Sequence, residues 1–301
     1  MENIPKSVGE KPLTDEKKPK AREAEAVPET KLEGPVAKQI ELAIEKLGKE
    51  NVFGPKEIEK IFGVRLAEVQ GIPFSIEELE RAEKLGQMLL LRVDKTAEGK
   101  PMSLEAMTKI MAHNKWKDKG KGDLLRTVED WKNLIGEDLF TQESPRAGWA
   151  LVGRDVLPES VNKNYIEQTE VIIKTLRDEA FKGMDVPEEY AEAIAEFESQ
   201  KDRLVKLVVD ADWQKAAKEL AGLKITQMTR GTFAETIYDF AAYHDVNNKR
   251  LLPYKYTWSA SLRPDGYLVN LGYFGVYGMS GYRLEPGTRR GDLGVYLSRR
   301  S

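Results

Sequence analysis

The sequence has 301 residues, 41% apolar side chains and a formal net charge of −3, so it has the means to bury a core but lacks a whole-molecule field for nucleic acid. It contains no Cys and only two His, which excludes disulfides, thiolate metal sites and cysteine nucleophiles, and no cofactor is expected. There is no apolar run long enough to span a bilayer and no signal-peptide core at the N-terminus, so a cytoplasmic location is expected.

The first third of the chain divides into two segments. Residues 1–33 have almost no large apolar side chains and mix Lys, Glu and Pro, which predicts a disordered arm. Residues 34–85 are expected to form a small helical region. One of its helices begins at Pro35, and another follows the capping box that Ser75 and Glu78 form.

Residues 86–301 alternate between helical and strand patterns, which predicts a mixed α+β domain. Gln87–Val93 and Trp149–Val152 are short apolar runs typical of buried strands. Thr232 and Glu235 form a further capping box, and the helix that follows is expected to pack beneath the C-terminal strands.

The stretch 254–301 differs in composition from the rest of the chain. It holds seven of the eleven Tyr and eight Gly, with seven Arg or Lys against three acids. The alternation over Gly266–Phe274 and the glycine turns around it predict short antiparallel strands and long loops with no helix.

A mixture of Tyr, Ser, Gly, Asn and Arg is typical of adaptable binding surfaces, because Tyr supplies a large amphipathic contact with few rotamers to fix. The same composition is also typical of an ordinary sheet edge, because Tyr and Trp favour strands. Nine residues are the candidate contact surface, and strand alternation requires that some of them belong to the core. They are Trp258, Arg263, Tyr267, Asn270, Tyr273, Tyr277, Tyr282, Arg289 and Arg290.

The last 70 residues carry a resemblance to a known family. The helix TFAETIYDFAAY, the element YTWSAS and the ending YRLEPGTRRGDLGVYLSRR resemble the C-type-lectin-like fold of the formylglycine-generating-enzyme branch. Its terminal motif is matched by Arg283, Pro286, Gly287, Arg289, Gly294 and Leu297. The sequence Gly294-Val295-Tyr296-Leu297 departs from the G-F-R-L form of the family.

Within that branch, the C-terminal block is similar to the variable region of proteins diversified by retroelements, including proteins from small-genome uncultured bacteria. The resemblance implies a rigid lectin-like scaffold that displays variable side chains on one surface. Formylglycine-generating enzymes depend on a Cys pair, which this chain lacks, and Glu285-Pro286-Gly287 lacks the Asn of calcium-dependent sugar readers. Neither chemistry is expected here.

The leading hypothesis is therefore a non-enzymatic ligand-binding protein with a protein partner. The alternative is a nucleic-acid-binding module that pairs phosphates with Arg283, Arg289, Arg290, Arg299 and Arg300 and stacks bases on the Tyr rings. A hydrolase or transferase ranks last, because the C-terminal stretch supplies only three acids and the chain has no P-loop, nucleophile elbow or zinc-protease motif.

Overall fold

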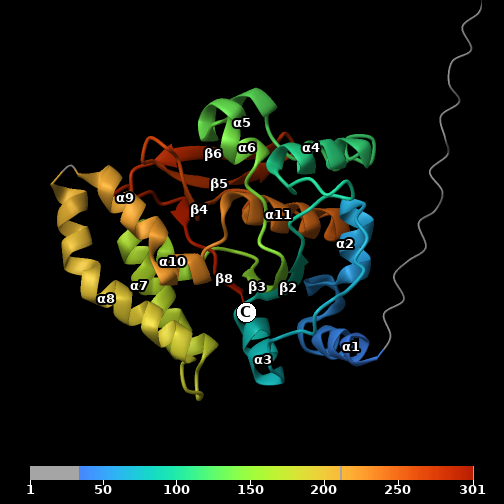
Figure 1. The fold of residues 1–301 in the computed structure, drawn as a ribbon, viewed down its shortest axis with the longest axis horizontal. Coiled ribbons are helices and arrows are strands. Elements are labelled where there is room, and N and C mark those ends of the chain that lie inside the picture. Colours follow the sequence, from blue (N-terminus) through green and yellow to red (C-terminus); the bar gives the residue numbers. More distant parts are fainter. Residues whose placement is uncertain (1–33, 211, 301) are drawn as a thin grey trace, which may run out of the picture.

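The computed structural model describes residues 34–210 and 212–300, and the expected disordered arm over 1–33 lies outside them. The described chain is an α+β fold with two four-stranded sheets among helices (Figure 1). The α-helices are α1 (Pro35–Leu47), α2 (Pro55–Phe62), α3 (Ile76–Lys84), α4 (Leu104–His113), α5 (Val128–Ile135), α6 (Glu137–Thr141), α7 (Tyr165–Thr175), α8 (Glu188–Val209), α9 (Trp213–Gly222), α10 (Lys224–Thr229) and α11 (Phe233–Asn247). Short 3-10 or π turns are η1 (Lys49–Asn51), η2 (Pro158–Ser160) and η3 (Leu176–Ala180). The strands are β1 (Val52–Phe53), β2 (Gln87–Arg92), β3 (Gly148–Gly153), β4 (Tyr256–Leu262), β5 (Leu268–Gly275), β6 (Gly278–Leu284), β7 (Leu293–Gly294) and β8 (Ser298–Arg300).

The first sheet has the strand order β1-β2-β3-β8. Strand β1 runs parallel to β2, and the other two pairings are antiparallel, with Leu90 opposite Ala150 and Val152 opposite Ser298. Every residue of β2 is buried. The two buried strands predicted near residues 87–93 and 149–152 are therefore confirmed.

The second sheet has the order β6-β5-β4-β7. Strands β4, β5 and β6 form an antiparallel meander, and β7 runs parallel to β4. Gly272 allows β5 to approach β4 closely, because a Cβ at that position would lie 2.1 Å from the carbonyl oxygen of Lys255. Between residues 254 and 300 the described chain contains strands and loops and no helix, as the sequence predicts.

Helix α11 connects the two sheets. The hydroxyl of Tyr238 donates to the carbonyl of Leu91 in β2 at 3.2 Å. On the other side, the ring of Phe240 lies 6.4 Å from that of Phe274 in β5. The helix begins at the predicted capping box, and it packs beneath the C-terminal strands as expected.

The helical region 34–85 shares its core with the rest of the chain. Its strand β1 pairs with β2, and the ring of Phe62 in α2 stacks on Tyr238 of α11 at 4.1 Å. Side chains from α1, α2 and α3 belong to the same apolar cluster as β2, β3 and α11. The residues on the two sides of the boundary predicted at residue 85 therefore share one continuous core.

In Figure 1 the group α7–α10 lies on the opposite side of the sheets from α1 and α2.

The short helices α5, α6 and α10 are absent from the predictions, and α6 and α10, with five and six residues, are too short for apolar periodicity to show. Helix α5 is fixed by tertiary contact, since the indole Nε1 of Trp131 donates to the carbonyl of Met279 in β6. Over the two described ranges, every helix is too short or too polar to cross a bilayer.

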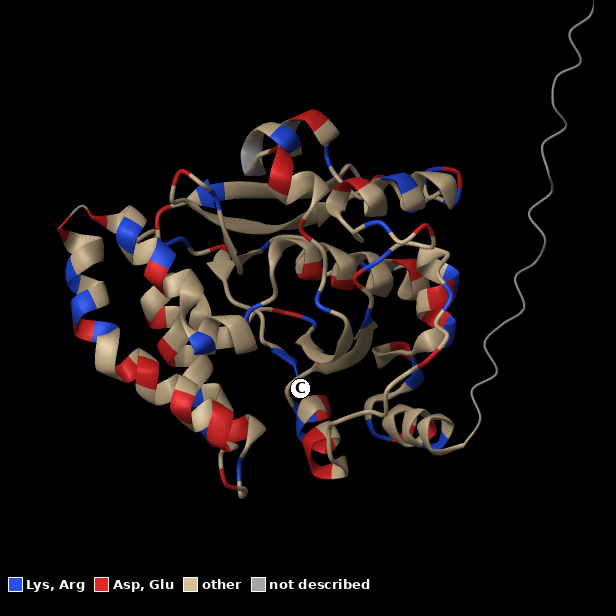
Figure 2. Ribbon diagram, viewed as in Figure 1, with Lys and Arg blue, Asp and Glu red and all other residues tan. Residues whose placement is uncertain are grey.

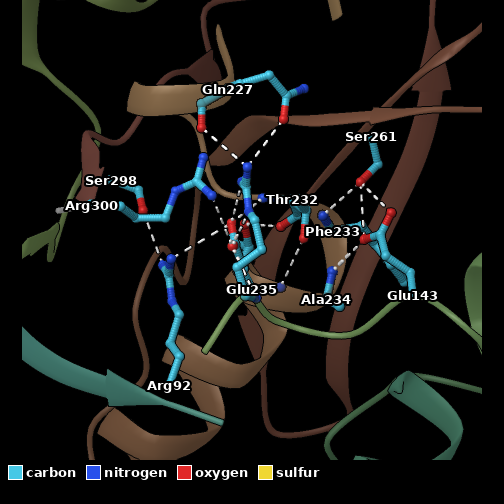
Figure 3. A network of polar contacts seen from close by, with 12 residues as sticks. Arg92, Glu143, Gln227, Thr232, Phe233, Ala234, Glu235, Ser261, Ser298 and Arg300 are labelled. Carbon is cyan, nitrogen blue, oxygen red and sulfur yellow. Dashed lines mark hydrogen bonds and ion pairs between the residues drawn. The ribbon is translucent and has the colours of Figure 1, made fainter. Parts of the chain in front are cut away.

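A buried charge cluster fixes α11 to the first sheet (Figure 3). The guanidinium of Arg92 in β2 donates to both carboxylate oxygens of Asp239 at 2.9 and 2.6 Å and to the hydroxyl of Ser298 in β8 at 3.0 Å. One turn earlier, the Glu235 carboxylate accepts two hydrogen bonds from the side chain of Arg146, at 2.8 and 3.0 Å. Burial alone would raise the pKa of Glu235, but Arg92, Arg146 and Arg300 outweigh it and lower the pKa to about 2.

This lowered pKa predicts an acid-sensitive contribution to stability. A carboxylate with a lowered pKa stabilises the fold above its unfolded-state pKa and loses that effect as the pH falls toward its folded-state pKa. The shift from 4.5 to about 2 corresponds to roughly 3 kcal/mol, at about 1.36 kcal/mol per pKa unit. The difference in unfolding free energy between the wild type and Glu235→Gln should therefore shrink by roughly that amount between these pH values, as measured by urea unfolding. A difference that stays constant across this range would contradict the assignment.

Candidate binding surface

Four Tyr rings meet at one end of the second sheet. Tyr273 stacks on Tyr256 at 5.0 Å between ring centroids, Tyr254 meets Tyr273 edge-on at 6.4 Å, and Tyr282 lies 5.3 Å from Tyr256. Tyr254, Tyr273 and Tyr282 are 76%, 42% and 43% exposed, whereas Tyr256 is buried beneath them. We call Tyr254, Tyr273 and Tyr282, with the buried Tyr256 and the partly exposed Arg290 beside them, the tyrosine surface.

Arg290 contacts two of these rings. Its guanidinium lies 5.3 Å from the centroids of both Tyr256 and Tyr282, within the range of cation–π attraction. The carboxylate of Asp292 fixes that guanidinium with two hydrogen bonds of 2.9 and 2.8 Å, which raise the pKa of Arg290. Burial is the main cause that raises the pKa of the Tyr256 phenol, and the neighbouring Tyr282 raises it further. The base of the tyrosine surface is therefore fixed by several contacts.

Strand geometry explains why this cluster forms. Tyr256 and Trp258 are two residues apart on β4 and share a face of the sheet. Trp258 is covered by Tyr165 of α7, at 5.5 Å, while Tyr256 at the start of the strand is covered by the neighbouring rings. Tyr273 lies in a bulge of β5 with φ of 48°, a left-handed conformation that its N–H supports by donating to Lys255 at 2.9 Å.

Three of the nine predicted contact residues, Tyr273, Tyr282 and Arg290, come together in the tyrosine surface. A fourth, Tyr277, is 76% exposed in the two-residue turn between β5 and β6, beside Val276. The other five lie elsewhere or are buried.

Tyr267, Arg263 and Arg289 lie outside the ring cluster. Tyr267 is half-buried before β5, against Trp213 of α9 at 4.6 Å. Arg263 bonds to Asp265 and to the carbonyl of Asn133. Arg289 is exposed, and its guanidinium pairs with Glu167 of α7 at 2.8 and 2.9 Å.

The prediction was wrong for Trp258 and Asn270, which face each other across β4 and β5. They are 0% and 1% exposed, because helices cover this part of the sheet. Both belong to the interior and not to a contact surface.

Sequence reasoning missed Tyr254, Tyr256 and Val276. A signal was present, because Tyr254, Tyr256 and Trp258 are spaced by two and belong on one side of an extended chain. The turn Val276-Tyr277 between Gly275 and Gly278 was a further indication of exposed apolar residues at a hairpin end.

The arginines of the nucleic-acid alternative are paired or buried. Arg299 is 1% exposed, with Glu78 at 3.3 Å, so the prediction that it faces phosphate was wrong. The remaining four also lie within ion-pair distance of a carboxylate. These pairs are Arg283 with Asp265, Arg289 with Glu167, Arg290 with Asp292 and Arg300 with Glu235. Electrostatic attraction to phosphate is correspondingly reduced.

Two of the three C-terminal acids are paired with arginines. Asp265 pairs with Arg263 and Arg283, and Asp292 pairs with Arg290. Figure 2 shows the ribbons of β4 to β6 largely without charged residues, in contrast to α8. Among the residues that the structure describes, no three His, Cys, Asp or Glu gather in a group fit to hold a metal ion.

Comparison with known proteins finds no matching family model, no matching curated protein and no matching solved structure.

The different burial of Trp258 and Tyr277 predicts stability effects of very different size. Trp258→Ala removes a fully buried indole and should lower the unfolding free energy by about 3–5 kcal/mol. Tyr277→Ala removes a side chain that is 76% exposed and should change it by no more than about 0.5 kcal/mol. The unfolding free energy of each variant is measured by chemical denaturation. Similar losses for the two variants would contradict the placement of these residues.

Proposed function

We propose that the chain is a non-enzymatic binding protein and that the tyrosine surface contacts a protein partner. The observation that carries this proposal is the ring cluster itself, in which the exposed Tyr273 and Tyr282 pack on Tyr256 and the exposed Tyr254 packs on Tyr273. Exposed aromatic groups fixed on a scaffold lose little conformational entropy on binding, and Tyr and Arg are enriched among the residues that dominate interface energies.

The charge around these rings favours a protein over a nucleic acid. Arg290 is neutralised by Asp292, and the nearby Lys255 by Asp155 at 2.8 Å. A backbone-tracking nucleic-acid groove needs uncompensated cations, because phosphate contacts supply most of its affinity. Aromatic area with few free charges is instead typical of the centre of a protein interface.

Replacing the three exposed rings tests the proposal. Partners are captured from a lysate of cells that encode the chain, and the affinity of each captured protein is then measured. The triple variant Tyr254→Ala, Tyr273→Ala, Tyr282→Ala should weaken binding roughly 100-fold or more, since single interface hot spots contribute about 2 kcal/mol or more.

The matched control removes equally exposed apolar residues elsewhere. Ile76, Val205 and Val209 are 43%, 39% and 76% exposed, against 42%, 43% and 76% for the three Tyr. Replacing these three by Ala should leave affinity within about twofold. Full affinity in the Tyr variant would contradict the proposal, as would generic single-strand DNA binding that falls steeply with salt.

The finer part of the proposal is that the second sheet belongs to a C-type-lectin-like scaffold whose last fifty residues are diversified by a retroelement. It is supported by the motif resemblance and by exposed Tyr beside turn glycines in residues 254–284. Sequencing the gene neighbourhood should find a reverse transcriptase and a near-identical repeat of the 3′ end. Differences between the repeat and the gene should fall on codons for Tyr254, Tyr273, Tyr277 and Tyr282, and not on those for Val269 and Leu271. A neighbourhood with neither element would contradict the diversification hypothesis. The binding hypothesis would still be tested by the triple Tyr variant and its control.

A further inference from the structure

A second candidate site lies at the first sheet, which does not contribute to the tyrosine surface. A pocket of about 300 Å³ opens between β3, α10 and the end of β8. Its charged and polar lining includes Arg92, Arg146, Arg300 and Gln227, and Trp149 and Met228 supply apolar walls. This volume is at the lower end of the range of small-molecule sites.

Three guanidinium groups gather around one carboxylate here. Arg146 is fully engaged, because its side chain donates to Glu235 and to the backbone and side-chain oxygens of Gln227. Arg92 and Arg300 lie farther from Glu235, with their Nη1 atoms 3.6 and 3.8 Å from its oxygens. In Figure 3 the side chains of Arg92 and Arg300 both extend toward the carboxylate of Glu235.

Two buried donors in this lining lack a hydrogen bond. The Nη1 atom of Arg92, whose side chain is 0% exposed, and the Nε atom of Arg300 have no hydrogen-bond partner among the described residues. A buried charged donor without a hydrogen bond is costly, since burial removes its water without replacing it. Both atoms belong to residues that line the same pocket.

Arginines outnumber acids among the residues that line the pocket. The lining contributes Arg92, Arg146 and Arg300 and one acid, Glu189, which is exposed to solvent, and the buried carboxylates Glu235 and Asp239 pair with these arginines from outside the lining. Burial, together with repulsion from Arg146 and Arg92, lowers the pKa of Arg300 to about 10 despite the attraction of Glu235. A monoanion meets less repulsion from the carboxylates of Glu235 and Asp239 than a dianion would.

We propose that this pocket binds a small organic monocarboxylate, with the carboxylate on Arg92 and Arg300 and the apolar part against Trp149 and Met228. Guanidinium groups match the planar carboxylate with charge-assisted hydrogen bonds. The apolar walls favour a ligand with a hydrophobic body over a bare inorganic ion.

Calorimetric titration of the full chain with benzoate, acetate and inorganic phosphate tests the proposal. Benzoate should bind saturably and more tightly than acetate or phosphate, and it should raise the melting temperature. Arg300→Gln should weaken benzoate binding about tenfold or more, because it removes one of the two guanidinium groups that would hold the benzoate carboxylate. Arg300→Lys should restore part of the affinity. Met228→Trp, which fills the pocket without changing its charge, should also abolish binding and so provides a test that does not depend on Arg300.

Arg177→Gln is the matched control, because Arg177 forms an exposed ion pair with Glu198 outside the pocket. Its affinity for benzoate should equal that of the wild type. The proposal would be overturned by an absence of saturable benzoate binding, by unchanged affinity in folded Arg300→Gln and Met228→Trp, or by phosphate binding more tightly than benzoate.

Discussion

The alternation of side chains along β4, combined with the unequal covering of its two ends, determines what the second sheet presents to solvent. Tyr256 and Trp258 point to the same side, and the ring of Tyr165 in α7 covers Trp258. At Tyr256 the covering is made by Tyr273, Tyr282 and Arg290, so three further aromatic or cationic groups are held at the surface. The same pattern of residues therefore gives core at one end of the strand and a candidate interface at the other.

Charge pairing gives the two candidate sites different characters. At the tyrosine surface, Arg290 is paired with Asp292, so its main effect is to fix the rings. At the pocket of the first sheet, three arginines meet two buried carboxylates, and buried guanidinium donors remain without hydrogen bonds. The first arrangement suits an aromatic contact with a macromolecule, and the second suits a small anion. Helix α11 lies between them, with Asp239 bound to the first sheet and Phe240 packed on the second.

Local sequence signals predicted much of the architecture. The capping boxes at Ser75 and Thr232 place the beginnings of α3 and α11, because their hydrogen bonds involve residues three apart. The apolar runs of β2 and β3 and the strand-and-loop character of residues 254–300 were also visible in the sequence.

The candidate sites depended on contacts that no local pattern records. Whether Trp258 or Tyr256 is covered by a helix depends on α7, which precedes them by about ninety residues. The neutralisation of Arg289 depends on Glu167, 122 residues away. The pocket joins side chains from β2, β3, α10 and β8, so sequence reasoning gave no indication of it.

The central claim, that sheet geometry exposes one set of Tyr rings and buries another, is tested most directly by mapping tyrosine nitration in the native protein by mass spectrometry. Limited tetranitromethane treatment should modify Tyr254, Tyr273, Tyr277 and Tyr282 and spare Tyr165, Tyr238 and Tyr296, which are at most 1% exposed. Equal modification of the two sets in folded protein, or preferential modification of the second, would contradict the account.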